Sequence, residues 1–139
     1  MCPQQLALTP RFGFLPKVRR FVILASWAIL ICCVVIGSLS PAASPLMVEI
    51  GRLRINDKVM HFCAYLILSL LPVIGFRDRR KGIVAGLSMF LLGILMEAGQ
   101  HFSPGRAVEL GDILANGAGV SCGVSFACLI LAIERRVLL

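Results

Sequence analysis

The stretch DKVMHFCAYLILSLLPVIGF, residues 57–76, begins with ionisable side chains and continues as an almost uninterrupted apolar run. From residue 59 onward, His61 is its only acidic or basic side chain. At about 1.5 Å per residue, a helix over residues 59–76 is just long enough for a hydrocarbon core of about 30 Å. The stretch therefore predicts a membrane-spanning helix with a polar end.

The composition of the whole chain also indicates a membrane protein. Of its 139 residues, 58% are hydrophobic and only 15% are charged, and the mean hydropathy is +0.91. A soluble domain has about 25% charged residues, so this chain lacks the charge for a fully hydrated surface. The net charge of +7 does not indicate nucleic acid, because the basic residues cluster beside apolar segments, where they set topology and contact anionic membrane lipid.

Three further apolar segments, residues 21–39, 82–102 and 113–133, are long enough to cross a bilayer. Open strands cannot span lipid because their backbone groups would stay unsatisfied, so all four segments are expected to be helices. The sequence thus predicts an all-α polytopic membrane protein with a four-transmembrane-helix bundle in residues 21–134. Residues 1–20 and 135–139 are expected to be cytoplasmic tails.

The distribution of the 14 basic residues predicts the orientation. Ten lie on the side of the two termini and of the connection after residue 76: Arg11, Lys17, Arg19, Arg20, Arg77, Arg79, Arg80, Lys81, Arg135 and Arg136. The opposite side has four: Arg52, Arg54, Lys58 and Arg106. Because cytoplasmic loops carry the excess of Lys and Arg, both termini are expected in the cytoplasm.

The first span has a basic flank and is followed by SPAAS, residues 40–44, which would suit a signal peptide. We expect it to be retained, because its apolar run is longer than a usual signal core. The six cysteines are expected to be packing residues, since they show no CxxC or Cys–His metal spacing. The connection of residues 40–56 predicts either a linker or a segment that lies in the membrane interface.

The ionisable residues fall in three runs, residues 57–65, 97–106 and 109–116, each at one end of a span. Asp57, His61 and Tyr65 are spaced i, i+4, i+8, so they project from one stripe of a helix, with Lys58 beside them. Threading the spans through a bilayer brings all three runs to the outer face. Charged groups at a membrane segment are costly, so their convergence indicates a functional site.

The other two runs show the same helical logic. Glu97 and Gln100 end the third span, and Asp112 and Asn116, spaced i, i+4, begin the fourth. Gly119 and Gly123 continue the face of Asn116 and favour a close approach of two helices. Asp112 could also cap its helix by accepting from free backbone amides. Arg106, on the turn between these spans, suits either a bridge to Glu97 and Asp112 or a bidentate clamp on an anion.

Two other interpretations of these residues stay open. A short polytopic protein can use a buried polar network simply to hold its helices together. His61, His101, Glu97 and Asp112 could also surround a divalent cation, but the HExxH spacing is missing, so we predict no metal and no cofactor.

At these residues the chain resembles the VanZ-like membrane proteins. The shared signature is DK-xx-H-xxx-Y, then E-xx-Q-xxx-P-x-R, then D-xxx-N-xx-G, and it falls within residues 57–123. Here it is formed by Asp57, Lys58, His61, Tyr65, Glu97, Gln100, Pro104, Arg106, Asp112, Asn116 and Gly119. The resemblance implies a bacterial inner-membrane protein of a family named for a teicoplanin-resistance determinant, and it supplies no reaction.

The sequence therefore predicts an outward-facing polar pocket that binds or modifies an anionic cell-envelope ligand, lipid-linked or a peptidoglycan precursor. His61 and Glu97 are the acid/base candidates, and Arg106 and Lys58 would hold the anionic group. Asp57 and Asp112 would orient these cations, while Tyr65, Gln100 and Asn116 would donate or accept hydrogen bonds. The alternative is a membrane scaffold without catalytic activity.

Overall fold

The computed structural model describes residues 14–137, and every regular element in this range is a helix. The helices are α1 (Phe14–Leu39), α2 (Pro45–Arg52), α3 (Asp57–Gly75), α4 (Arg79–Gln100) and α5 (Leu110–Val137). Four of them, α1, α3, α4 and α5, are long and apolar enough to cross a membrane. The predicted all-α, four-span architecture is confirmed, and α2 is an additional short helix between the first two spans.

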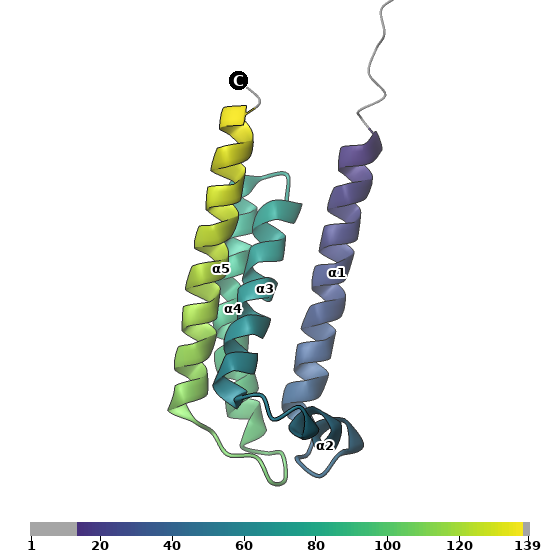
Figure 1. Ribbon diagram of the computed structural model, residues 1–139, viewed down its shortest axis with the longest axis vertical. Helices are drawn as coiled ribbons and strands as arrows, with labels where there is room; N and C mark the ends of the chain where they lie inside the picture. Colours follow the sequence, from purple (N-terminus) through teal and green to yellow (C-terminus); the bar gives the residue numbers. More distant parts are fainter. Residues whose placement is uncertain (1–13, 138–139) are drawn as a thin grey trace, which may run out of the picture.

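The four long helices lie alongside one another, and α3 is the central one (Figure 1). α3 packs against α5, α4 and α1, and its contact with α5 is the most extensive of the three. The start of α1, the α3–α4 turn and the end of α5 lie at one end of the bundle, opposite α2 (Figure 1). We call the opposite end, formed by α2 and the α4–α5 connection, the α2 end.

The helix boundaries follow from local capping. The Asn56 side chain accepts from the Lys58 amide, so α3 already begins at Asp57. The Asp78 carboxylate accepts from the amides of Arg80 and Lys81 at the start of α4. Near the N-terminus, α1 begins at Phe14, so the helix includes the basic segment that precedes the first predicted span. Residues 1–13 of the predicted tail, which include Arg11 and Cys2, lie outside the described residues.

A proline explains how α1 is joined to α3. Pro72 has no N–H, so the carbonyl of Leu68, one turn earlier, lacks its usual helical donor. The indole Nε1 of Trp27 on α1 donates to this carbonyl at 2.8 Å. A buried carbonyl left without a donor costs about 1–3 kcal/mol in proteins, so this bond favours one register of α1 on α3.

Glycines allow α5 to approach α3 closely, as their spacing predicted. A Cβ at Gly119 would collide with the Phe62 carbonyl, and a Cβ at Gly123 would collide with the Leu66 carbonyl and the Ser69 hydroxyl. Ser69 Oγ also donates to the Val120 carbonyl of α5 at 3.3 Å. Because α3 and α5 carry Asp57, His61, Asp112 and Asn116, this tight contact sets the relative positions of the polar residues.

Candidate functional site: a polar pocket at the α2 end

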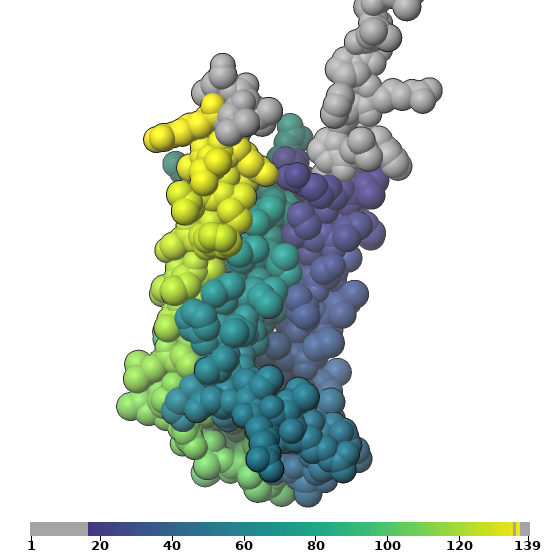
Figure 2. Space-filling view, in the orientation of Figure 1, coloured from purple at the N-terminus to yellow at the C-terminus, as the bar shows by residue number. Residues whose placement is uncertain are grey.

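A cavity of about 460 Å³ opens at the α2 end between α1, α2 and α3. Five of the predicted site residues line it: Asp57, His61, Tyr65, Gln100 and Arg106. Its other walls are mainly apolar and come from α1 and α2, for example Val34, Met47 and Ile50. Figure 2 shows α2 and the chain that follows it covering the lower end of α1. The pocket therefore combines polar side chains from α3, from the end of α4 and from the α4–α5 connection with an apolar wall from α1 and α2.

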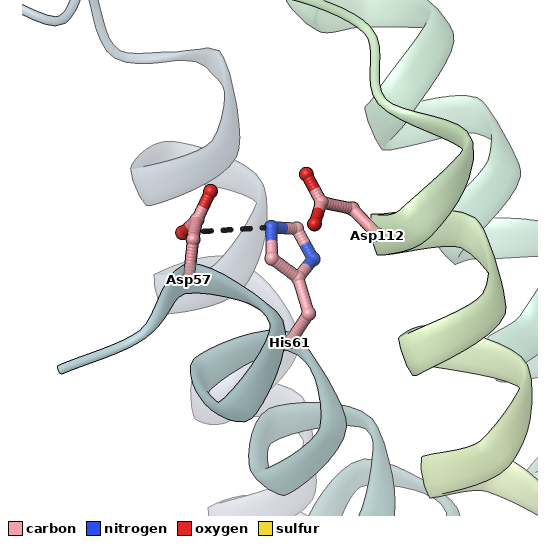
Figure 3. A group of neighbouring side chains, drawn as sticks. All are labelled: Asp57, His61 and Asp112. Carbon is pink, nitrogen blue, oxygen red and sulfur yellow. Dashed lines mark ion pairs between the residues drawn. The ribbon is translucent and has the colours of Figure 1, made fainter.

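His61 lies between two helices and two carboxylates. Its Nδ1 is 3.0 Å from Asn116 Oδ1 on α5, and its Nε2 is 4.0 Å from Asp57 Oδ1 one turn earlier on α3. The ring points between Asp57 and Asp112 (Figure 3). An Nδ1–H that donates to Asn116 leaves Nε2 with a lone pair toward the carboxylates.

Lys58 is engaged with acids that begin α5. Its Nζ is 2.8 Å from Glu109 Oε2 and 3.6 Å from Asp112 Oδ1. The ammonium lowers the pKa of the Glu109 carboxyl, first through the hydrogen bond and second through its charge. Lys58 is not among the residues that line the pocket. The predicted second cation of the site thus lies beside the pocket and already has two carboxylate partners.

Glu97 is enclosed behind the pocket, with 1% of its surface exposed. Its Oε1 accepts from the Glu109 amide at 2.8 Å, which ties the end of α4 to the residue before α5. Glu97 does not line the pocket, and no hydrogen bond among the described residues joins it to His61. The two acid/base candidates therefore occupy different surroundings: His61 faces the cavity and Glu97 faces the protein interior.

Four buried polar atoms lack a hydrogen-bond partner within the part of the chain that the structure describes. They belong to the four most enclosed site residues and are Tyr65 Oη, Glu97 Oε2, Asp112 Oδ1 and Asn116 Nδ2. Gly93 packs against two of these residues, because a Cβ there would meet Asn116 Nδ2 at 3.0 Å and the Tyr65 ring at 3.1 Å. Such groups are uncommon in proteins, and a cluster of them indicates unused binding capacity.

Arg106 bonds to α1 and α2. Its Nη2 donates to the Gly37 carbonyl at 3.3 Å and to Met47 Sδ at 2.8 Å, and its Nε reaches the Ser40 carbonyl at 3.5 Å. Among the described residues it forms no ion pair, so the predicted bridge to Glu97 or Asp112 is not formed. Its guanidinium instead lines the cavity while it is held by neutral groups.

The structure brings together a different set of possible metal ligands from the one considered in the sequence, which was His61, His101, Glu97 and Asp112. His101 is exposed and packs edge-on against Phe102. Asp57, His61 and Asp112 instead each offer one ligand atom, and these atoms all lie within 4.8 Å of one another. For Asp112, no bond from its carboxylate to a backbone amide occurs among the described hydrogen bonds, so the predicted capping role is not seen there.

Two side chains that bond to predicted site residues, those of Met47 and Glu109, were not themselves predicted as site residues. Ser44 followed by Pro45 is a helix-start signal that could have located α2, and α2 carries Met47 toward Arg106. Glu109 is separated from Asp112 by less than one helical turn and is therefore near any cation that reaches Asp112. Its backbone amide also holds Glu97, which no side-chain pattern reveals.

Comparisons with protein-family models, with curated proteins and with solved structures gave no match. The VanZ-like resemblance therefore rests on the signature residues alone and stays a prediction.

Proposed function

We propose that this membrane protein binds an anionic amphiphile, a lipid or lipid-linked envelope precursor, in the pocket at the α2 end. Arg106 is the observation that carries the proposal. Its guanidinium lines the cavity, is half-buried, and has only two carbonyls and a thioether as partners among residues 14–137. A cation without a counter-charge near the membrane boundary attracts an anion strongly, because charges attract each other more strongly where the dielectric constant is lower than in water.

The walls of the pocket fit the two halves of such a ligand. Gln100, Tyr65 and His61 offer hydrogen-bonding groups near Arg106, which suits a phosphate or carboxylate headgroup. Val34, Ile50 and Met60 form an apolar surface, which suits an acyl or isoprenyl chain. If the ligand is also modified, His61 is the acid/base group that faces it, because Glu97 does not line the pocket.

We further propose that the chain is a VanZ-like protein of the bacterial inner membrane, with both termini in the cytoplasm and the pocket facing outward. The ligand would then belong to the outer leaflet or to the peptidoglycan precursors, and a link to glycopeptide (teicoplanin) resistance follows from the resemblance. The basic residues support this orientation, since the sequence assigns only four of the 14 to the side of the α2 end.

The proposal is tested by lipid binding to the purified protein in detergent. Phosphatidylglycerol and phosphatidylcholine with the same chains are titrated against the wild type and Arg106→Lys. Lys keeps the charge and loses the planar fork, so we expect anionic lipid to bind at least about tenfold more weakly, with unchanged melting.

Arg52→Lys is the matched control. Arg52 is also at the α2 end, but it is exposed, and its one ion pair within the described part of the chain is with Glu49 on its own helix. Anionic binding should persist in this variant. Equal binding of the two lipids by the wild type, or an equal loss in both variants, would contradict a specific role for Arg106.

The second candidate is a scaffold whose polar residues only hold the helices together. One observation favours it: the bond from the Glu109 amide to Glu97 Oε1 fixes α4 to the start of α5 without facing the cavity. A scaffold predicts that variants of the polar residues lose stability and activity in parallel. The ligand-binding proposal predicts that pocket variants such as Arg106→Lys separate the two.

A further inference from the structure

We propose that Asp57, His61 and Asp112 form a binding site for a divalent cation, and that this cation is zinc. The site deepens the proposed function, because two of its three residues, Asp57 and His61, line the same pocket as Arg106. One imidazole and two carboxylates are ligands that zinc commonly takes in proteins. The three come from both α3 and α5, and the ring of His61 lies between the two carboxylates (Figure 3).

The distances fit ligands that share one ion. The candidate ligand atoms lie within 4.8 Å of one another, and His61 Nε2 is 4.0 Å from Asp57 Oδ1. This separation is too long for a hydrogen bond. Ligands about 2.0–2.2 Å from a tetrahedral zinc are roughly 3.3–3.6 Å apart, so small side-chain rotations bring the three atoms to one ion.

The burial of Asp112 provides an independent argument. It is only 2% exposed, and its Oδ1 lacks a hydrogen-bond partner among the described residues. A buried carboxylate needs a paired charge or a metal, because the desolvation of an uncompensated charge is costly. The nearest cation, Lys58 Nζ, is 3.6 Å away and is bonded to Glu109 at 2.8 Å. Asp112 is therefore only partly neutralised within the described protein.

The surroundings of His61 suit a metal ligand. Asn116 Oδ1 is 3.0 Å from Nδ1, and the Nδ1–H that donates to it fixes the tautomer in which Nε2 carries the lone pair. Metal-binding histidines almost always use their second nitrogen in this way. The fourth position of a zinc ion held here is left for water or for an oxygen of the anionic ligand. This last assignment rests on the proposed function, whereas metal binding itself does not.

Metal binding is measured on the full-length protein in detergent after chelation and dialysis. Co²⁺ is titrated and followed by its visible d–d absorption, Zn²⁺ is measured by displacement of Co²⁺, and bound metal is counted by elemental analysis. Because the chain has six cysteines, the titrations are repeated in a variant with all six replaced by alanine. We expect one ion per chain in both backgrounds.

The variants separate this site from other donors. Asp57→Asn and Asp112→Asn should each weaken binding by at least about tenfold, and Asn116→Ala by about 10–100-fold. Lys58→Met should strengthen it, because a competing cation beside Asp112 is removed. His101→Gln removes the only other histidine in the sequence and should leave affinity unchanged. Asp57 is exposed, so its variant stays informative even if Asp112→Asn does not fold.

Less than one bound ion per two chains in the wild type would overturn the proposal, as would metal binding that Asp57→Asn does not weaken. Lipid binding by the metal-free protein is measured separately with Arg106→Lys. Zinc binding without anionic-lipid binding would leave the metal site standing and reject the proposed function, and the reverse result would reject only the metal site.

Discussion

Glu97 and Arg106 are near each other in the sequence, yet their side chains bond to different parts of the bundle. Glu97 Oε1 holds the Glu109 amide at the entrance to α5, while Arg106 Nη2 reaches the Gly37 carbonyl near the end of α1. The buried carboxylate thus serves the packing of α4 and α5, and the guanidinium serves the pocket. These different surroundings give the two residues different expected responses to substitution.

Substitution of Glu97 should separate its bonding role from its charge. Glu97→Gln keeps an acceptor oxygen for the Glu109 amide, so we expect the free energy of unfolding to change by less than about 1 kcal/mol. Glu97→Ala leaves that amide unpaired and should cost about 1–3 kcal/mol. Unfolding in mixed detergent and SDS micelles measures both. A loss of stability in Glu97→Gln as large as that in Glu97→Ala would show that the charge, not the acceptor, holds this contact.

Part of the site could be predicted at the residue scale because helical spacing is regular. The stripe of Asp57, His61 and Tyr65 follows from their i, i+4, i+8 positions, and the structure gives Asp57 and His61 their close approach in this way. The partners of Arg106 could not be predicted. They depend on the path of the α4–α5 connection, where Gly105 adopts a positive φ of 76°. Spacing along one helix contains no information about such a turn.

At the scale of the helices, the bond from Trp27 to the Leu68 carbonyl makes α1 dependent on a proline in α3. Apolar packing in lipid gives little preference for one register over another, because the lipid chains are as apolar as the helix surfaces. A hydrogen bond to a carbonyl that lacks its helical donor is therefore the specific link between these two helices. It also sets the position of the α1 wall of the pocket.

A double-mutant cycle tests this link. Trp27→Phe should cost about 1 kcal/mol in the free energy of unfolding, because the Leu68 carbonyl loses its donor. In a Pro72→Ala background the N–H of residue 72 can supply the helical bond, so the same substitution should cost clearly less. An equal cost in both backgrounds would mean that Trp27 contributes through packing alone. Both values come from the same micellar unfolding measurement.

The helices themselves were predictable from hydropathy, since each span is a long apolar run that lipid stabilises only as a helix. Their ends were less predictable, because capping by Asn56 and Asp78 extends α3 and α4 beyond the apolar residues. For the region of the short α2, the sequence predicted only a linker or a segment that lies in the membrane interface. Its eight residues form a helix because Ser44 accepts from the Met47 amide and Pro45 takes the first turn.

For the whole molecule, the start of α1 and the end of α5 lie at the end of the bundle opposite α2 (Figure 1). Because the number of spans is even, the chain enters and leaves the membrane domain on the same side. The basic connection between α3 and α4 lies at that same end, whereas Lys58 and Arg106 are at the α2 end. We expect the uneven distribution of Lys and Arg between the two ends to decide which end faces the cytoplasm.

Topology reporters fused at three positions test this orientation. Fusions after Arg80 should be active as cytoplasmic reporters, and fusions after Arg54 and Gly105 should be active as periplasmic ones. The reason is the excess of Lys and Arg at the end that holds the termini. The opposite result at all three positions would mean that the pocket faces the cytoplasm. Different compartments for Arg54 and Gly105 would contradict the four-span fold itself.

The central claim is that the pocket at the α2 end holds an anionic amphiphile against Arg106. Native mass spectrometry of the protein released directly from its own membranes tests it most directly, with Arg106→Gln as the comparison and Arg52→Gln as the control. We predict one anionic lipid or lipid-linked precursor per chain in the wild type and in Arg52→Gln, and its loss in Arg106→Gln. Retention of only zwitterionic lipid by the wild type, or of the same anionic adduct by Arg106→Gln, would contradict the claim.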